Sequence, residues 1–140
     1  MSLDESYRIV LADDHALVRQ GVRKILEERC DLEVVGEARD GLDLLNLLKV
    51  LKLSPHMVIL DISMPNMSGI DAIRRVKELH PDIKVLVLTM RKSMDYVKYA
   101  LTAGADGYIL KEYADKVLFS TIERIRQGTG FVSPVFEAWE

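Results

Sequence analysis

The sequence contains little cysteine, proline or tryptophan: one, four and one, respectively, in 140 residues. The single cysteine, Cys30, excludes an internal disulfide bond and a multi-cysteine zinc site, and it fits a reducing compartment such as the cytoplasm. No apolar run reaches the roughly 18 residues that a membrane-spanning helix needs, and the N-terminus lacks the apolar core of a signal peptide. We therefore expect a cytoplasmic protein with no membrane segment.

A basic excess is absent as well. The chain carries 19 basic and 22 acidic side chains, and its net charge is −3. Residues 1–70 hold 8 basic and 12 acidic groups, whereas residues 71–140 hold 11 and 10. Neither half has the basic arm or patch that neutralises phosphates in nucleic-acid binding. We therefore do not expect this chain to bind DNA by itself.

What is present is a regular alternation of short apolar runs and helical periods. Four of the five runs are almost continuously aliphatic, which is typical of strands covered on both faces of a parallel sheet. The second run alternates and contains Glu33 and Glu37, so we expect it at an edge of the sheet. The runs span residues 8–12, 32–38, 57–60, 84–88 and 107–110.

Between the runs, apolar residues recur three and four positions apart, which predicts a helix after each strand. Ser93 is the expected N-cap of the fourth helix, and Gly104 and Gly128 are expected to end the fourth and fifth helices. The alternation predicts an α/β fold, a flavodoxin-like (βα)5 three-layer sandwich with a parallel five-stranded sheet in the order 2-1-3-4-5. We expect residues 6–128 to form one domain and residues 129–140 to begin a connection outside it.

Polar residues follow four of the five predicted strands. Asp13 and Asp14 follow the first, Asp61 the third, Thr89 the fourth and Lys111 the fifth. The carboxyl ends of parallel strands meet at one edge, and ligands bind at that edge where the strand order reverses, here between the first and third strands. This order puts Asp13 and Asp14 one strand spacing, about 5 Å, from Asp61.

Three carboxylates so close together repel one another by roughly 3 kcal/mol for each pair. Either one acid is protonated or a cation occupies the site, and a compact set of oxygen ligands suits Mg²⁺ or Mn²⁺. The flexible side chain of Lys111 can reach back over the acids, and Thr89 offers a hydroxyl group. A carboxylate nucleophile beside a cation, a lysine and a hydroxyl fits phosphoryl transfer, in which positioning and charge neutralisation matter most.

Over about residues 6–128, the sequence resembles the receiver domain of two-component response regulators. His15, Met90 and residues 107–111 are similar to the corresponding parts of the NarL/FixJ (LuxR-type) subfamily. Its members regulate transcription and usually carry a C-terminal helix-turn-helix domain that binds DNA; residues 131–134 resemble the start of the linker to such a domain. The matching stretches are Val10–Arg19, Asp61–Gly69, Val87–Met90 and Ala103–Lys111.

The resemblance implies a role for each matching residue. Asp61 would accept a phosphoryl group from a phosphohistidine on a sensor histidine kinase. The metal ion would be held by Asp14 directly, by Asp13 through water, by Asp61 and by the backbone carbonyl of Ser63. Lys111 would pair with the phosphoryl oxygens. The chain would then be a signalling switch that catalyses only its own phosphorylation and dephosphorylation, and not an enzyme in the usual sense.

The resemblance also implies how the switch would work. Thr89 would move to hydrogen-bond a phosphoryl oxygen, and Tyr108 would turn inward into the space that Thr89 leaves. Met64, Pro65 and Gly69 would shape the loop behind Asp61. These roles rest on the resemblance, because Tyr108 taken alone is more simply a strand aromatic that packs whether or not it switches.

Two protein contacts are expected as well. The sensor kinase should dock near Ala16, Leu17 and Arg19 and the loop after Lys111. Two copies of the chain could pair through the first and fifth helices or through the face near Tyr108.

Three other functions compete with this interpretation. A haloacid-dehalogenase-like phosphatase also uses an aspartate and Mg²⁺, but it needs acids two residues apart, whereas Asp13 and Asp14 are adjacent. A flavin carrier of the same topology would need a phosphate-binding loop where these acids would repel phosphate. An unphosphorylated pseudo-receiver would serve only as an interaction module, although all the expected site residues are present. His15 alone is best explained as an exposed residue at the start of a helix.

Overall fold

The computed structural model describes residues 6–64 and 67–132, with the backbone alone at residues 131–132. One parallel sheet runs through the molecule in the order β2-β1-β3-β4-β5-β6. The strands are β1 Tyr7–Ala12, β2 Leu32–Ala38, β3 Met57–Leu60, β4 Lys84–Thr89, β5 Gly107–Leu110 and β6 Phe131–Val132. The first five have the expected order, and β2 lies at the expected edge.

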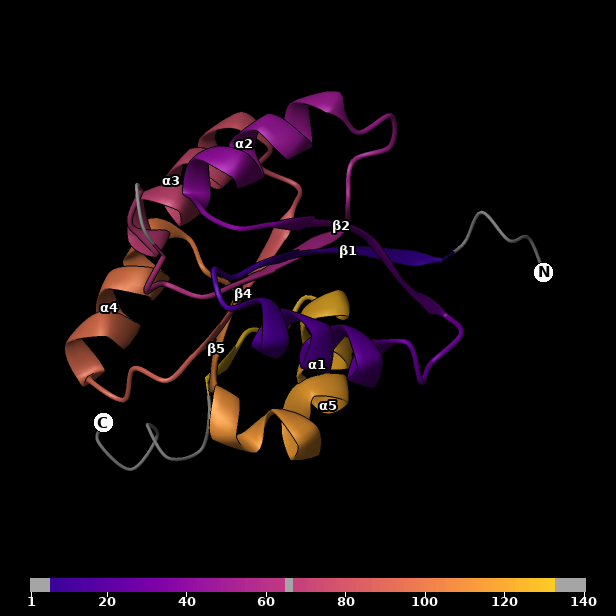
Figure 1. Ribbon diagram of the computed structural model, residues 1–140. Coiled ribbons are helices and arrows are strands. Elements are labelled where there is room, and N and C mark those ends of the chain that lie inside the picture. The colour runs from indigo at the N-terminus through magenta and orange to yellow at the C-terminus, as the bar shows by residue number, and fades with distance from the viewer. Residues whose placement is uncertain (1–5, 65–66, 133–140) are drawn as a thin grey trace.

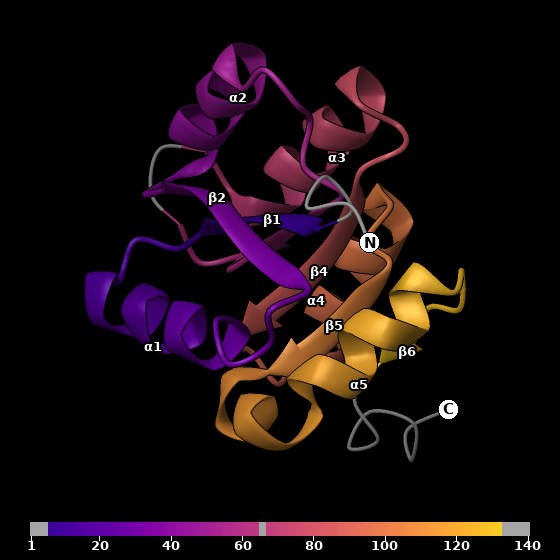
Figure 2. The same cartoon turned by 90° about the vertical axis from the view of Figure 1, so that its right-hand side faces the viewer.

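Helices cover both faces of the sheet (Figure 1). The helices are α1 Ala16–Leu26, α2 Gly41–Val50, α3 Gly69–Leu79, α4 Met94–Ala103 and α5 Ala114–Arg126, with a 3-10 turn, η2, at Lys111–Tyr113. Helices α1 and α5 lie on one face, and α2, α3 and α4 lie on the other, as the turned view shows most clearly (Figure 2). The expected flavodoxin-like three-layer fold is therefore confirmed.

The alternation of side chains along β1 explains why the apolar runs are nearly continuous. Ile9 and Leu11 are buried against α1 and α5, whereas Val10 and Ala12 are buried against the opposite layer. Successive residues of a strand point to opposite faces, so a strand with a core on both sides needs an apolar residue at every position.

The predicted ends of α4 are confirmed. The hydroxyl of Ser93 accepts a hydrogen bond from the backbone N–H of Asp95, and Gly104 ends the helix at a φ of 116°, in the left-handed region that favours glycine. Gly128, at a φ of 87°, follows α5 in the same way. Among the described residues, no helix has the length and apolar character needed to cross a membrane.

One element was not expected. Residues Phe131–Val132 form β6, which pairs in parallel with Gly107 and Tyr108 on the outer edge of β5. Within the connection expected at residues 129–140, residues 131–132 thus add a short strand to the sheet, and residues 133–140 lie outside the described residues. The pairing is local and carries no apolar run of its own, so periodicity gave no signal for it.

Candidate functional site

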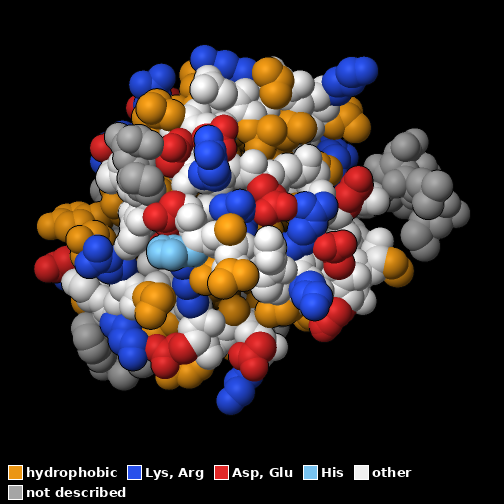
Figure 3. Space-filling model, in the orientation of Figure 1, with side chains coloured by type: hydrophobic (Ala, Val, Ile, Leu, Met, Phe, Trp, Pro, Cys, Tyr) orange, Lys and Arg blue, Asp and Glu red, His pale blue; other side chains and the backbone are white. Residues whose placement is uncertain are grey.

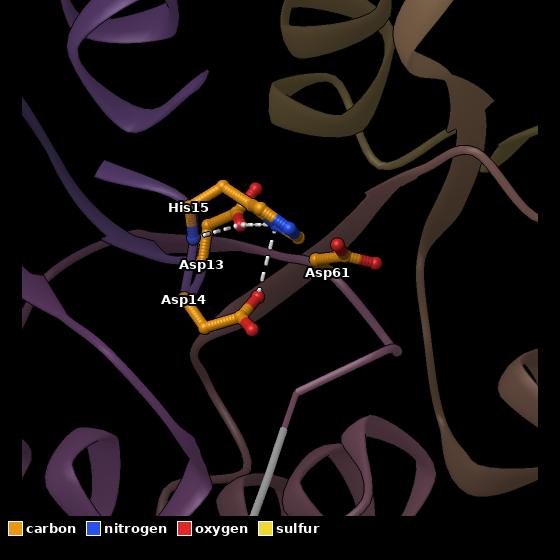
Figure 4. Close-up of side chains that lie close together, drawn as sticks. All are labelled: Asp13, Asp14, His15 and Asp61. Atoms are coloured by element: carbon orange, nitrogen blue, oxygen red, sulfur yellow. Dashed lines mark hydrogen bonds and ion pairs between the residues drawn. The ribbon is translucent and has the colours of Figure 1, made fainter. Parts of the chain in front are cut away.

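The predicted acids meet at the carboxyl edge of the sheet. The backbone N–H of Asp13 donates to Ala38 at 3.0 Å, and that of Asp61 donates to Ala12 at 3.0 Å, so each acid is fixed to the neighbouring strand as its own strand ends. The ligand atoms of Asp13, Asp14, His15 and Asp61 lie within 4.8 Å of one another. Asp13, Asp14 and His15 come from the segment after β1, and Asp61 comes from the end of β3 (Figure 4).

Lys111 reaches the acids from the end of β5, as predicted. Its Nζ lies 2.9 Å from Oδ2 of Asp13 and 2.9 Å from Oδ2 of Asp61. Burial alone would lower the pKa of Lys111, but the hydrogen bonds to Asp13 and Asp61 outweigh it and raise the pKa above its ordinary value. One ammonium group therefore sits among three carboxyl groups, and it cannot balance all three when they are ionised.

His15 is exposed and occupies the N-cap position of α1, as expected, but its ring does more than that. Nδ1 lies 3.3 Å from an oxygen of Asp13 and 3.1 Å from an oxygen of Asp14. Its backbone N–H also donates to the Asp13 side chain at 2.9 Å. The interpretation as only a helix-start residue was thus incomplete, because no spacing rule links a histidine to the two acids directly before it.

The donor set fits a hard divalent cation. Carboxylate oxygens are the ligands that Mg²⁺ and Mn²⁺ prefer, and like charges this close need a counter-charge. Asp61 and Asp13 share Lys111, whereas His15 is the group that contacts the carboxylate of Asp14. The acids thus form a pocket suited to Mg²⁺. The Ser63 backbone N–H donates to Asp61 at 3.0 Å, while metal binding by the Ser63 carbonyl remains a prediction.

Thr89 and Tyr108 lie behind the acids, and both are fully buried. The Thr89 hydroxyl accepts a hydrogen bond from the backbone N–H of Arg91 at 3.3 Å, and the Tyr108 hydroxyl donates to the carbonyl of Arg91 at 2.8 Å. Burial raises the pKa of the Tyr108 phenol, with a further contribution from Asp61. The ring of Tyr108 is thus buried in this structure, and its turning inward on phosphorylation stays a prediction.

Of the three residues predicted to shape the loop after Asp61, the structure describes Met64 and Gly69. Met64 is buried in the core beside α3, and the backbone N–H of Gly69 donates to Ile62 at 3.1 Å. A Cβ atom on residue 69 would lie 2.2 Å from the Cα of Ile62, so only glycine fits there. Pro65 lies outside the described residues.

The contacts of two arginines in the site region were not predicted. Arg91 donates to the Ser63 hydroxyl at 2.9 Å and lies 5.1 Å over the ring of Tyr96, so it links the loops after β3 and β4. Arg19, which we expected on a kinase-docking surface, is largely buried, with its guanidinium bonded to the carbonyl of Asp13 and to Glu37. Sequence spacing predicts neither the contact of Arg91 with Ser63 nor that of Arg19 with Glu37. Met90, which directly follows β4, is 77% exposed.

Comparison with known proteins agrees with this geometry. Residues 9–123 match the family model of the response regulator receiver domain. The chain belongs to this family. It is 36% identical over 131 residues to the transcriptional regulatory protein DegU of Brevibacillus brevis, covering 94% of this chain and 55% of the relative. It is 43% identical over 126 residues to the oxygen regulatory protein NreC of a Staphylococcus epidermidis strain, covering 89% and 57%. This receiver domain thus spans a little more than half the length of these relatives.

Solved structures place the receiver domain in the same subfamily. A LuxR-family two-component response regulator from Aurantimonas sp. superposes with a TM-score of 0.88 at 32% identity, covering 95% of this chain and 94% of that one. The receiver domain of RcsB from Salmonella enterica, solved with the phosphomimetic BeF3-, gives a TM-score of 0.84 at 32% identity, covering 92% and 94%. The predicted NarL/LuxR-type receiver is confirmed.

Proposed function

We propose that the chain is a phosphorylation-controlled switch in which Asp61 accepts one phosphoryl group from a phosphohistidine of a sensor kinase. The phosphorus–nitrogen bond of the donor breaks, a phosphorus–oxygen bond to the Asp61 carboxylate forms, and the donor histidine takes up a proton. The observation that carries the proposal is that Asp61 meets Asp13 and Asp14 within 4.8 Å at one edge of the sheet, where Lys111 lies 2.9 Å from both Asp61 and Asp13.

Each side chain has a task in this transfer. Asp14 and Asp13 would hold Mg²⁺ or Mn²⁺, with Asp61 and the Ser63 carbonyl completing the protein ligands. The bound ion would neutralise the charge that collects on the phosphoryl oxygens during transfer. Lys111, freed from one of its two carboxylates, would pair with a phosphoryl oxygen.

The switch would then act on Thr89 and Tyr108. A phosphoryl oxygen on Asp61 would accept the Thr89 hydroxyl proton, and turning that hydroxyl would weaken the hydrogen bond that it accepts from the Arg91 N–H. Because Tyr108 is held by the carbonyl of the same residue, Arg91, a shift in that loop changes how α4 and β5 present their surfaces. A small energy difference between the two arrangements is enough for such a population shift.

The kinase contact belongs to the same proposal. Leu17 of α1 is 83% exposed. Met90 is 77% exposed and, together with Lys111, lines a cleft of about 560 Å³. Exposed apolar side chains around a charged centre suit a protein partner that must bring its own reactive group to the site. Arg19 does not present its guanidinium on this surface, because the group is bonded to the carbonyl of Asp13 and to Glu37.

DNA binding and a cytoplasmic location complete the proposal. Basic and acidic side chains are interspersed over the face seen in Figure 3, without a field of one sign. We therefore assign DNA contact to a C-terminal domain like those of the longer relatives, outside residues 6–128. Pairing of two copies through α1 and α5, or through the face near Tyr108, stays a hypothesis that light scattering with and without phosphodonor tests.

The deciding experiment treats the chain with a small acyl phosphate and Mg²⁺, followed by intact mass. We expect one added phosphoryl group that is labile to alkali, and none with Asp61→Asn or without the metal. Asp71→Asn is the matched control, because Asp71 is an exposed acid on α3 paired with Arg74. Uptake by Asp61→Asn at the wild-type level would refute the proposal.

The same assay separates the alternatives. Continuous turnover of free phosphate esters would favour the phosphatase, and an unchanged mass would favour the interaction module. Neither alternative is supported by the family match, and the acids adjacent to each other after β1 argue against a phosphatase or a flavin site.

A further inference from the structure

Arg19 of α1 lies next to the acid cluster and contacts the backbone of Asp13. It lies one turn into α1, and its side chain is 15% exposed. One guanidinium nitrogen, Nη1, donates to the backbone carbonyl of Asp13. The side chain also lines, together with Asp13 and Asp61, a cavity of about 10 Å³ beneath the acids. Arg19 therefore contacts the backbone that carries the acids without pairing with any of their carboxylates.

A second anchor holds the guanidinium in place. Nε of Arg19 donates to Oε1 of Glu37 at 2.8 Å, and Glu37 stands on β2, opposite Leu11 of β1. Burial alone would raise the pKa of Glu37, but hydrogen bonds from Arg19 and Arg23 outweigh it and keep the pKa below its ordinary value. The carboxylate is therefore ionised at neutral pH, and it fixes Arg19 at two diverging points.

We propose that Arg19, clamped by Glu37, is a positioning residue that orients the peptide between Asp13 and Asp14 for divalent-cation binding. The carbonyl it holds belongs to this peptide, so a rotation about the Asp13 Cα–C bond would move both the carbonyl and the Cα of Asp14. The Asp14 carboxylate contacts only the exposed ring of His15 among the described side chains. Groups that orient metal ligands are worth about 10- to 100-fold in affinity in other proteins. This inference rests on the proposed function and deepens it.

A positioning role and a purely electrostatic role of Arg19 differ in the direction of the change in cation affinity when the side chain is removed. Arg19 is a positive charge near a cation site, so its loss by charge alone would strengthen cation binding. Loss of a positioning group would weaken it. The two explanations therefore predict opposite changes for Arg19→Ala.

Arg23 provides the matched control. Its Nη1 pairs with the other oxygen of the same Glu37, but it makes no hydrogen bond to Asp13 among the described contacts. Arg23→Ala therefore removes the same charge and one bond of the same carboxylate while leaving the Asp13 carbonyl held. Arg19→Lys keeps the charge but cannot supply two diverging donors from one rigid plane.

The test measures binding of Mn²⁺ alone to the whole chain by electron paramagnetic resonance of the free ion. We expect Arg19→Ala and Arg19→Lys to weaken Mn²⁺ affinity about tenfold, with Arg23→Ala within about twofold of wild type. Unfolding in metal-free urea checks folding, and Arg19→Lys serves if Arg19→Ala does not fold. In phosphoryl uptake, both Arg19 variants should need more Mg²⁺ for half-maximal rate while keeping the rate at saturating metal.

The outcomes are distinct. Unchanged or tighter Mn²⁺ binding by both Arg19 variants would overturn the positioning role, as would equal weakening in Arg19→Ala and Arg23→Ala. A wild-type chain that binds Mn²⁺ but takes up no phosphoryl group would instead refute the proposed function and leave the role of Arg19 standing.

Discussion

The two ends of the same strands carry opposite chemistry. The carboxyl edge has a cleft of about 560 Å³ lined by Lys111, Met90 and Lys92 among others, and the amino edge has one of about 540 Å³ lined by Arg8, His56, Lys84 and Arg126 among others. The two cleft volumes are nearly equal, so the presence of a cleft does not distinguish the functional edge from the other. What distinguishes it is a cluster of three acids, two of which share a single lysine.

At the amino edge the charged groups serve the fold. The guanidinium of Arg8 donates twice to the carbonyl of Ser54, at 3.1 and 2.9 Å, and its backbone N–H donates to Nδ1 of His56. Arg126 lies 4.4 Å over the ring of Tyr7, which stacks on His56. These groups hold loops to strands, whereas the acids of the opposite edge are held together against their mutual repulsion. Four substitutions test this contrast.

The largest expected effect lies in the loop that supports the carboxyl edge. Gly69→Ala should lower the free energy of unfolding by about 3 kcal/mol, because the new Cβ would meet the backbone of Ile62. Gly21→Ala, in α1, has nothing within 4 Å of the new atom and should raise it by about 0.5–1 kcal/mol. Urea denaturation measures both free energies. An unchanged free energy of unfolding in Gly69→Ala would contradict the prediction and show that the loop backbone can shift to accommodate the new Cβ.

The second effect concerns repulsion among the acids. Asp14→Asn should raise the free energy of unfolding of the metal-free protein by about 1–2 kcal/mol, while it removes a cation ligand. Asp82→Asn is the control, because Asp82 is exposed at the amino edge near basic side chains and should change stability little. Denaturation in the presence of a chelator measures both variants. A lower free energy of unfolding in Asp14→Asn would contradict the claim that the acids at the carboxyl edge repel one another.

A smaller effect is expected at the amino edge. Arg8→Met removes the two hydrogen bonds to Ser54 and should cost about 1 kcal/mol of stability. Phosphoryl uptake and Mn²⁺ affinity should stay at the wild-type level, because the change lies at the far end of the strand from Asp13. Reduced uptake in a fully folded Arg8→Met variant would mean that the two edges are coupled.

The smallest effect is a pH dependence. Burial, and then the charges of Arg8 and Arg126, lower the pKa of His56 below its ordinary 6.5. The unfolded chain therefore binds the proton more readily, so this stability is complete above pH 6.5 and is lost as the pH falls through the lowered folded-state value. His56→Gln should lose less stability than wild type between about pH 7 and pH 5, by less than about 1 kcal/mol. Parallel stability curves for the two proteins would contradict this assignment.

The strands, helices and site acids were predictable because their signals are local or periodic. A strand buried on both faces, such as β3, must be apolar at every position, and a polar residue at its end, such as Asp61, stands out. Parallel connectivity then brings Asp13, Asp61 and Lys111 to one edge without any knowledge of side-chain packing. The contacts of Arg19 with Glu37 and of Arg91 with Ser63 join residues 18 and 28 positions apart and follow no period.

The sequence by itself thus determined the layered fold and which acids meet, because hydrophobic periodicity and chain order are enough to specify both. Only the tertiary structure decided how those acids are held: by an arginine that binds the Asp13 carbonyl and a neighbouring strand, and by a lysine shared between two carboxylates. Such contacts depend on the directions and lengths of side chains across several elements, and no pattern along one element encodes them.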